Sequence, residues 1–259
     1  MSAVATTPAP APLSLPRPPT ARLTYVELRK MTDTRAGFWL LFVIAAATFA
    51  AAILRIALGN ESEHTLQEAF SVAQLPSSVL LPVLAILCVT SEWSQRTALT
   101  TFALVTKRPR VVLAKVLAAV VIAALGTLVA LLFALVGTAI GSVVLGSGTW
   151  SLSLHAVAES FLLQAIGTLG GIAFGMVFLA SAPAIVLYFV LPTVWGIITA
   201  IIPGMDDIAK WLDLGRTTTD LSEFDISGIG WARLATSVAL WVAVPFVIGL
   251  VRIVRREVA

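Results

Sequence analysis

Residues 111–145 read VVLAKVLAAVVIAALGTLVALLFALVGTAIGSVVL, an apolar run whose charged residue is Lys115. A helix rises about 1.5 Å per residue, so this run would reach some 50 Å, whereas the hydrocarbon core of a bilayer is roughly 30 Å thick. The helix therefore either protrudes from the membrane or breaks near Gly137 and Gly141. In both cases the run predicts a membrane-spanning helix.

The rest of the chain is built in the same way. Of its 259 residues, 58% are hydrophobic and 12% are charged, against roughly 45–50% and 25% in soluble domains. The second apolar run is the weakest, because it contains Pro82 and spans only if its helix begins upstream, near Phe70 or at Pro76. We predict an all-α polytopic fold with six spans, over residues 37–58, about 70–90, 111–145, 155–182, 184–202 and 231–251.

The basic residues predict the orientation, because lysine and arginine accumulate in cytoplasmic loops. If the N-terminus is inside, the 17 lysines and arginines fall on the cytoplasmic side except Arg55, Lys210, Arg216 and Arg233. We therefore expect a multi-pass protein of a bacterial plasma membrane with both termini in the cytoplasm. The basic residues lie between apolar runs and not on one face, which argues against nucleic acid as a partner.

The residues outside the spans form two terminal tails and three segments with a predicted character of their own. Residues 1–19 are rich in proline and lack the features of a signal peptide, so we expect a disordered cytoplasmic tail. Residues 20–252 form the six-span domain, and residues 253–259 form a second cytoplasmic tail. Within the domain we expect an amphipathic elbow helix at 20–36, an inner segment at 91–110 and an outer helical segment at 204–229.

Two of these segments carry a helical pattern. In the elbow, Leu23, Val26 and Met31 fall broadly on one side, as in a basic helix that lies on the lipid surface. In the outer segment, Asp206 is expected to cap a short helix that Gly215 ends. That helix would cover the outer end of the bundle.

The residues that most membrane enzymes need are missing from the sequence. The histidines, His64 and His155, do not form a zinc-binding set, and no base for a serine nucleophile lies within the spans. A phosphate-binding loop is also missing. We therefore expect no catalytic, cofactor or metal site, and no enzymatic activity in this chain. Glu159 and Gln164 in the fourth span are the candidates for a substrate path.

The fourth span also carries glycines at four-residue spacing, Gly167, Gly171 and Gly175. Small residues so spaced allow two helices to approach closely. They predict a packing face, either within the bundle or between subunits.

Three segments resemble a known family. The run SEWSQRT at 91–97, followed by the basic turn KRPR at 107–110, resembles the inner loop of type-two exporter permeases of the ATP-binding-cassette (ABC) family. The run VELRK at 26–30, with Thr34 and Arg35 after it, is similar to the elbow helix of those permeases. The C-terminal run GLVRIVRRE at 249–257 resembles their basic end.

The resemblance implies a six-span subunit that pairs with a second copy or a close relative and with two separate ATPase subunits, which hold ATP and Mg. In that family the inner loop forms a coupling helix that sits in a groove of the ATPase, and a helical hairpin follows the fifth span. On this basis the coupling interface would contain Glu92, Trp93, Arg96, Thr97, Arg108 and Arg110, and the elbow would contain Glu27, Lys30 and Arg35. The alternative is that these residues only set topology and anchor the ends of the spans.

The nearly uncharged spans favour an apolar or amphipathic cargo, such as a drug, a lipid or a peptide. The leading hypothesis is thus the permease subunit of an ABC exporter, with membrane lipid, an ATPase subunit and a second permease as partners. The alternative is a non-transporting sensor or resistance subunit that works with an ABC ATPase.

Overall fold

The computed structural model describes residues 18–58, 65–95, 108–144, 146, 149–224, 226 and 228–255. Among these residues, six helical stretches are long and apolar enough to cross a membrane, so the chain is a multi-pass, all-α membrane protein, as the sequence predicts. In chain order the helices are α1 (Thr20–Asp33), α2 (Arg35–Leu58), α3 (Leu66–Ser94), α5 (Arg108–Val144), α6 (Leu154–Phe178), α7 (Ser181–Ile201), α8 (Asp206–Leu212), α9 (Leu214–Ser222), α10 (Ile229–Val238) and α11 (Val244–Arg255).

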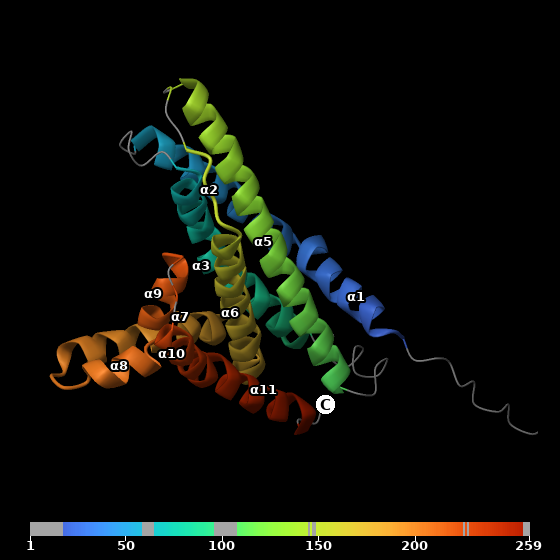
Figure 1. Ribbon diagram of the computed structural model, residues 1–259. Helices are drawn as coiled ribbons and strands as arrows, with labels where there is room; N and C mark the ends of the chain where they lie inside the picture. Colours follow the sequence, from blue (N-terminus) through green and yellow to red (C-terminus); the bar gives the residue numbers. More distant parts are fainter. Residues whose placement is uncertain are drawn as a thin grey trace, which may run out of the picture.

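Both described ends of the chain meet the start of α5 (Figure 1). Arg110 donates a hydrogen bond of 2.8 Å to the carbonyl of Pro18, and Arg108 donates one of 2.8 Å to the carbonyl of Ile253. The N-terminal residues and the end of the last helix therefore lie at the same end of the bundle, which we call the α1 end. We call the opposite end of the bundle the far end. The six candidate spans agree with this arrangement, because an even number of crossings returns a chain to the side on which it began.

Two uncertainties about the spans are resolved by the helix bounds. The helix α5 continues without a break for 37 residues, through Gly137 and Gly141, so it is long enough to extend beyond a bilayer core. The helix α3 begins upstream of its prolines, as spanning requires. Thr65 caps it by accepting a hydrogen bond of 3.1 Å from the backbone N–H of Glu68.

Other predicted bounds are wrong by a few residues. The fourth span ends at Phe178 rather than at 182, because Leu179 adopts a left-handed backbone conformation with φ of 56°. The first span begins at Arg35, after α1 has ended. The last spanning stretch runs from Ile229 to Arg255 and contains a π-helical turn, η2 (Ala239–Ala243). It therefore includes the start of the predicted C-terminal tail, while the N-terminal tail lies almost wholly outside the described residues.

The most extensive contact between two helices joins α3 and α6. The glycine face of α6 lies against α3: a β-carbon at Gly171 would overlap the carbonyl oxygen of Pro82, and one at Gly175 would lie 3.1 Å from Cβ of Val89. At Gly167 it would lie 3.3 Å from Cγ of Pro82. Of the two alternatives for this face, the structure thus has the one within the bundle.

The outer segment is placed differently from the prediction. It forms two helices and not one, because Asp213 ends α8 and caps α9 by accepting a hydrogen bond of 2.9 Å from the N–H of Gly215. Gly215 is therefore inside α9 and does not end a helix. Leu221 of α9 packs against Ile166, about halfway along α6, so α9 lies beside the middle of α6 and does not cover the end of the bundle (Figure 1).

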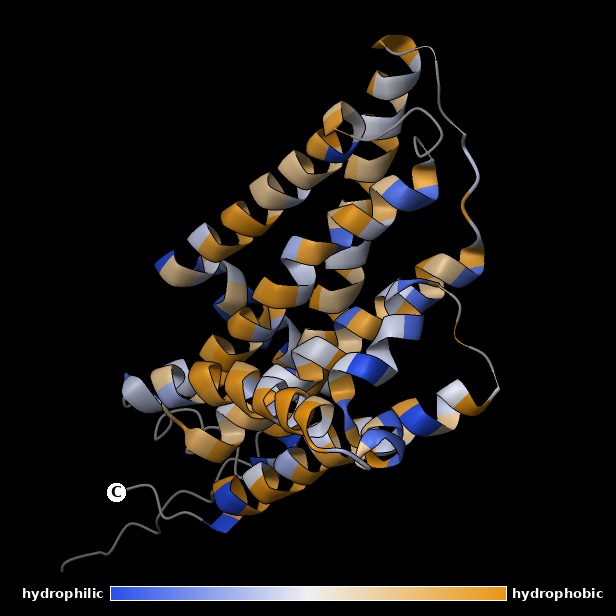
Figure 2. Ribbon diagram, turned by 90° about the vertical axis from the view of Figure 1, so that its left-hand side faces the viewer, coloured by the Kyte–Doolittle hydropathy of each residue, from blue (hydrophilic) through white to orange (hydrophobic). Residues whose placement is uncertain are grey.

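Apolar residues extend along the long helices and reach the outside of the bundle (Figure 2). On α7, for example, Val186 is 55% exposed and Ile197 is 52% exposed. Such a surface is suited to hydrocarbon and not to water.

Candidate functional site

The face of α1 that the structure buries overlaps only in part with the apolar face that the sequence predicts for the lipid surface. Glu27 and Met31 are buried, whereas Val26 is 41% exposed. A carboxylate therefore lies on the buried side of this helix, next to α5 and the end of α3. Such a position requires a partner of opposite charge, because an isolated buried charge is very costly.

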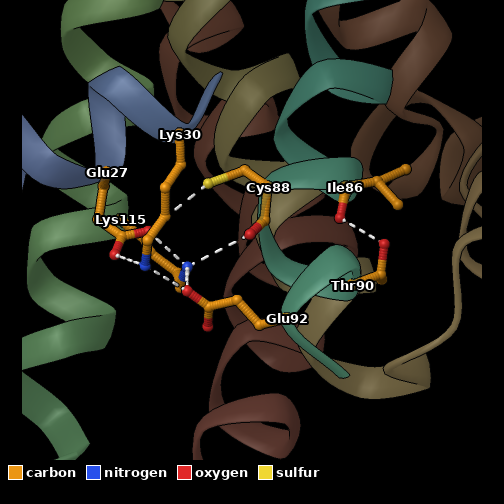
Figure 3. A network of polar contacts seen from close by, with 7 residues as sticks. All are labelled: Glu27, Lys30, Ile86, Cys88, Thr90, Glu92 and Lys115. Carbon is orange, nitrogen blue, oxygen red and sulfur yellow. Dashed lines mark hydrogen bonds and ion pairs between the residues drawn. The ribbon is translucent and has the colours of Figure 1, made fainter. Parts of the chain in front are cut away.

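That partner is found in a cluster of four charged residues, Glu27, Lys30, Glu92 and Lys115, which we call the charge cluster (Figure 3). Lys115 Nζ lies 2.5 Å from Glu27 Oε2 and 3.0 Å from Glu92 Oε1. Lys30 Nζ lies 2.7 Å from Glu27 Oε1 and 2.6 Å from Glu92 Oε1. Each lysine thus binds both carboxylates, and the cluster joins α1, α3 and α5.

The charges of the cluster balance, and three of its members are almost completely buried. Glu27, Glu92 and Lys115 are 3%, 5% and 4% exposed. Lys115 also donates a hydrogen bond of 3.2 Å to the carbonyl of Cys88, which satisfies a further buried group. Removal of a single partner would leave an uncompensated charge in the interior, so the cluster can persist only as a unit.

Lys30 is the most accessible member, with a side chain that is 35% exposed. Partial burial and the nearby Lys115 both lower the pKa of Lys30, but Glu92 and Glu27 raise it by more, so the net shift is upward. Lys30 therefore stays charged throughout the physiological pH range.

The predicted coupling residues do not form one exposed surface in the described part of the chain. Glu92 is occupied within the charge cluster. Trp93 is half-buried and packs against the apolar cluster of α3, α5, α6 and α11. Arg108 and Arg110 bind carbonyl groups of this same chain. The remaining two predicted coupling residues, Arg96 and Thr97, lie outside the described residues.

The three predicted elbow residues also do not lie together at one site. Glu27 and Lys30 belong to the charge cluster, but Arg35 is exposed and is the first residue of α2. The elbow ends at Asp33, and the extended conformation of Thr34 separates it from the first span. Burial of Glu27 therefore makes α1 an integral part of the bundle, and not only a helix on the lipid surface.

Both candidates for a substrate path, Gln164 and Glu159, are buried residues of α6. Gln164 donates hydrogen bonds of 2.7 Å to Oε1 of Gln74 and 2.6 Å to the hydroxyl of Ser77. Glu159 is 2% exposed, and its carboxylate lies 2.9 Å from the ring nitrogen of the exposed His155. The structure thus brings Gln164 to two polar residues of α3. It places Glu159 beside a histidine one turn away, but within the described part of the chain neither carboxylate oxygen accepts a hydrogen bond.

Sequence reasoning found three members of the charge cluster but assigned them to two separate sites, and it assigned Lys115 to neither site. A signal was available, because Lys115 lies within an apolar run and a lysine in such a position needs an acidic partner. Few acids lie on the same predicted side of the membrane, and Glu27 and Glu92 are among them.

Within the part of the chain that the structure describes, the charge cluster offers no exposed nucleophile, and its two positive and two negative charges balance. It links three helices at one point, near the two helices that flank the segment 96–107. Its role is therefore structural: it holds these helices together, and we call it a joint in this sense. No model of a known protein family and no curated protein sequence matches this chain.

Proposed function

We propose that this chain is the transmembrane permease subunit of an ATP-driven exporter of the ABC type-two class. The observation that carries the proposal is the charge cluster, which binds α1 to the last turn of α3 and to the early part of α5. The segment 96–107 connects those two helices and has the sequence that resembles a coupling loop. Both of its flanks are therefore attached to the same joint.

Such a joint would transmit a movement of the segment 96–107 to the membrane helices. A displacement of the segment would move α3, α5 and α1 together, because none of the four charges can leave the cluster without exposing its partners to a large desolvation penalty. The chain lacks a phosphate-binding loop, so the energy has to come from a separate subunit that binds ATP and Mg. A second permease would complete the path.

The cargo that fits the bundle best is apolar or amphipathic. The interior between α3 and α6 offers amide and hydroxyl groups such as Gln164 and Ser77, and Glu159 is the one acidic residue of α6. Neutral polar groups of this type can bind part of an amphipathic molecule, whereas a strongly charged solute would need charged partners along its path.

The test uses the intact chain with an affinity tag, expressed in its native host. Arg96→Glu reverses a charge in the segment 96–107, and Lys210→Glu makes the same change at an exposed ion pair on α8. We expect the Arg96 variant to insert normally but to lose both the copurifying ATPase and export from vesicles. The Lys210 variant should retain the ATPase.

Equal retention of an ATPase by both variants would contradict the coupling role, and so would purification of the native chain without any ATPase. Copurification of an ATPase without any compound that stimulates its turnover would favour the sensor or resistance subunit instead.

A further inference from the structure

A pocket of about 230 Å³ lies between α3, α6, α7, α9 and the π-helical turn. Ile166, Gly170 and Phe174 of α6 line it and are buried. Thr193 of α7 and Gly215 of α9 also line it, and both are exposed. The pocket therefore leads from the outside of the bundle into its interior.

Part of this space exists because three lining residues are glycines, which have no side chain. Gly167, Gly170 and Gly215 all line the pocket. A β-carbon at Gly170 would lie 3.1 Å from the ring of Tyr188 and 3.6 Å from the side chain of Val242. Val242 belongs to the π-helical turn, and such turns occur frequently at functional sites.

The polar side chains of the lining are already satisfied within the protein. The hydroxyl of Tyr188 donates to the carbonyl of Gly167, and the indole N–H of Trp241 donates to the carbonyl of Leu212. The hydroxyls of Ser78, Thr193 and Thr218 likewise donate to carbonyls of their own helices. A buried water needs two to four polar partners, so these walls favour an apolar occupant.

The depth of the pocket indicates which apolar molecule is available. Its lining on α6 extends from Leu163 to Phe174, and α6 begins at Leu154. At about 1.5 Å per residue, the pocket lies roughly 14 to 30 Å along a candidate span. Its α9 side carries an exposed ion pair between Arg216 and Asp206, whereas its α7 side is apolar and exposed, as suits hydrocarbon. A cavity without an occupant forfeits dispersion contacts, and acyl chains are the abundant molecules at this depth.

We propose that this pocket binds the acyl chain of a membrane lipid. Its volume of about 230 Å³ exceeds the roughly 150 Å³ of an apolar cavity that accepts benzene. The exposed apolar residues Val190 and Val194 lie next to the lining on α7 and provide a surface along which a chain reaches the mouth. This assignment does not depend on the proposed export function.

The test uses the full chain in vesicles of phosphatidylethanolamine and phosphatidylglycerol that contain a phosphatidylcholine with a diazirine in one acyl chain. After irradiation, we expect label on Phe174, which is 4% exposed and out of reach of lipid outside the bundle. Thr193→Trp fills the mouth and should abolish this label. Val194→Trp adds the same bulk on a 44% exposed position outside the pocket and should leave the label unchanged.

Label confined to exposed residues such as Val190 would overturn the proposal, as would label on Phe174 that persists in Thr193→Trp. If Thr193→Trp does not insert, Thr218→Leu narrows the pocket from α9 and carries the same expectation.

Discussion

Lys115→Met is the sharpest test of the charge cluster. The change keeps the length of the side chain, and among the described residues it leaves Lys30 as the cation that contacts both Glu27 and Glu92. Removal of one partner from a buried ion pair costs about 3–5 kcal/mol, and the burial of Glu27, Glu92 and Lys115 places this cluster in that class. For a chain of this size, that cost corresponds to a melting temperature lower by roughly 6–20 °C.

A second variant separates charge imbalance from the loss of packing. Lys115→Met combined with Glu27→Gln removes one charge of each sign and retains the contact of 2.6 Å between Lys30 and Glu92. We expect the double variant to lie within about 2 kcal/mol of the native protein, because its remaining defect is an imperfectly bonded amide. The two single changes should therefore be strongly non-additive.

The assay is the fraction of monodisperse protein that remains after heating in mild detergent. Lys210→Met is the control, because it removes a cation from an exposed pair with Asp207 and should change stability by less than about 1 kcal/mol. If Lys115→Met melts with the control, or if the double variant is as unstable as the sum of the single ones, the cluster is not the joint that the geometry indicates.

Three further outcomes are expected. Gly171→Leu places a side chain on the carbonyl of Pro82 and should prevent accumulation of folded protein, and normal yield would contradict the close contact between α3 and α6. The pKa of Lys30 is raised above its ordinary 10.5, so its stabilisation is complete below that pH and is lost as pH rises through the higher folded value. The difference in melting temperature between the native chain and Lys30→Met should therefore shrink under strongly alkaline conditions. With Cys88 replaced, an impermeant thiol reagent on intact cells should label a cysteine at the exposed Ser151, between α5 and α6 at the far end, but not one at the exposed Gln95; the reverse pattern would invert the predicted orientation.

The spans were predictable because they depend on composition over about 20 residues, and the bilayer requires that composition wherever the chain crosses. The residues at which the spans begin and end were less predictable. Leu179 turns the chain in a left-handed conformation without the glycine that usually indicates such a turn. The boundary between α8 and α9 at Asp213 did have a signal in the sequence, because aspartate is a common helix cap. The prediction nevertheless ended the helix at Gly215, because glycine commonly follows the last residue of a helix.

The charge cluster was only partly predictable, because its members are far apart in the sequence. Glu27 and Lys30 lie one turn apart on a helix, but Glu92 and Lys115 join them only through the packing of α1 against α3 and α5. The pocket at Tyr188 was beyond sequence reasoning for a similar reason. It depends on where five separate helical segments meet, and a pattern along one helix does not contain that information.

The pairing of α3 with α6 also affects how the protein is made. Gln74 receives its hydrogen bond from Gln164, which follows it by 90 residues. At about 5–20 residues per second, the ribosome needs roughly 5 to 20 s to supply that partner. During this interval α3, with two prolines and a buried amide, has left the ribosome without the helix against which it finally packs. Until α6 is made, the main native partners of α3 among the described helices are α1, α2 and α5, so a delay in translation before α6 would prolong the time for which the face of α3 that carries Gln74 lacks its final partner.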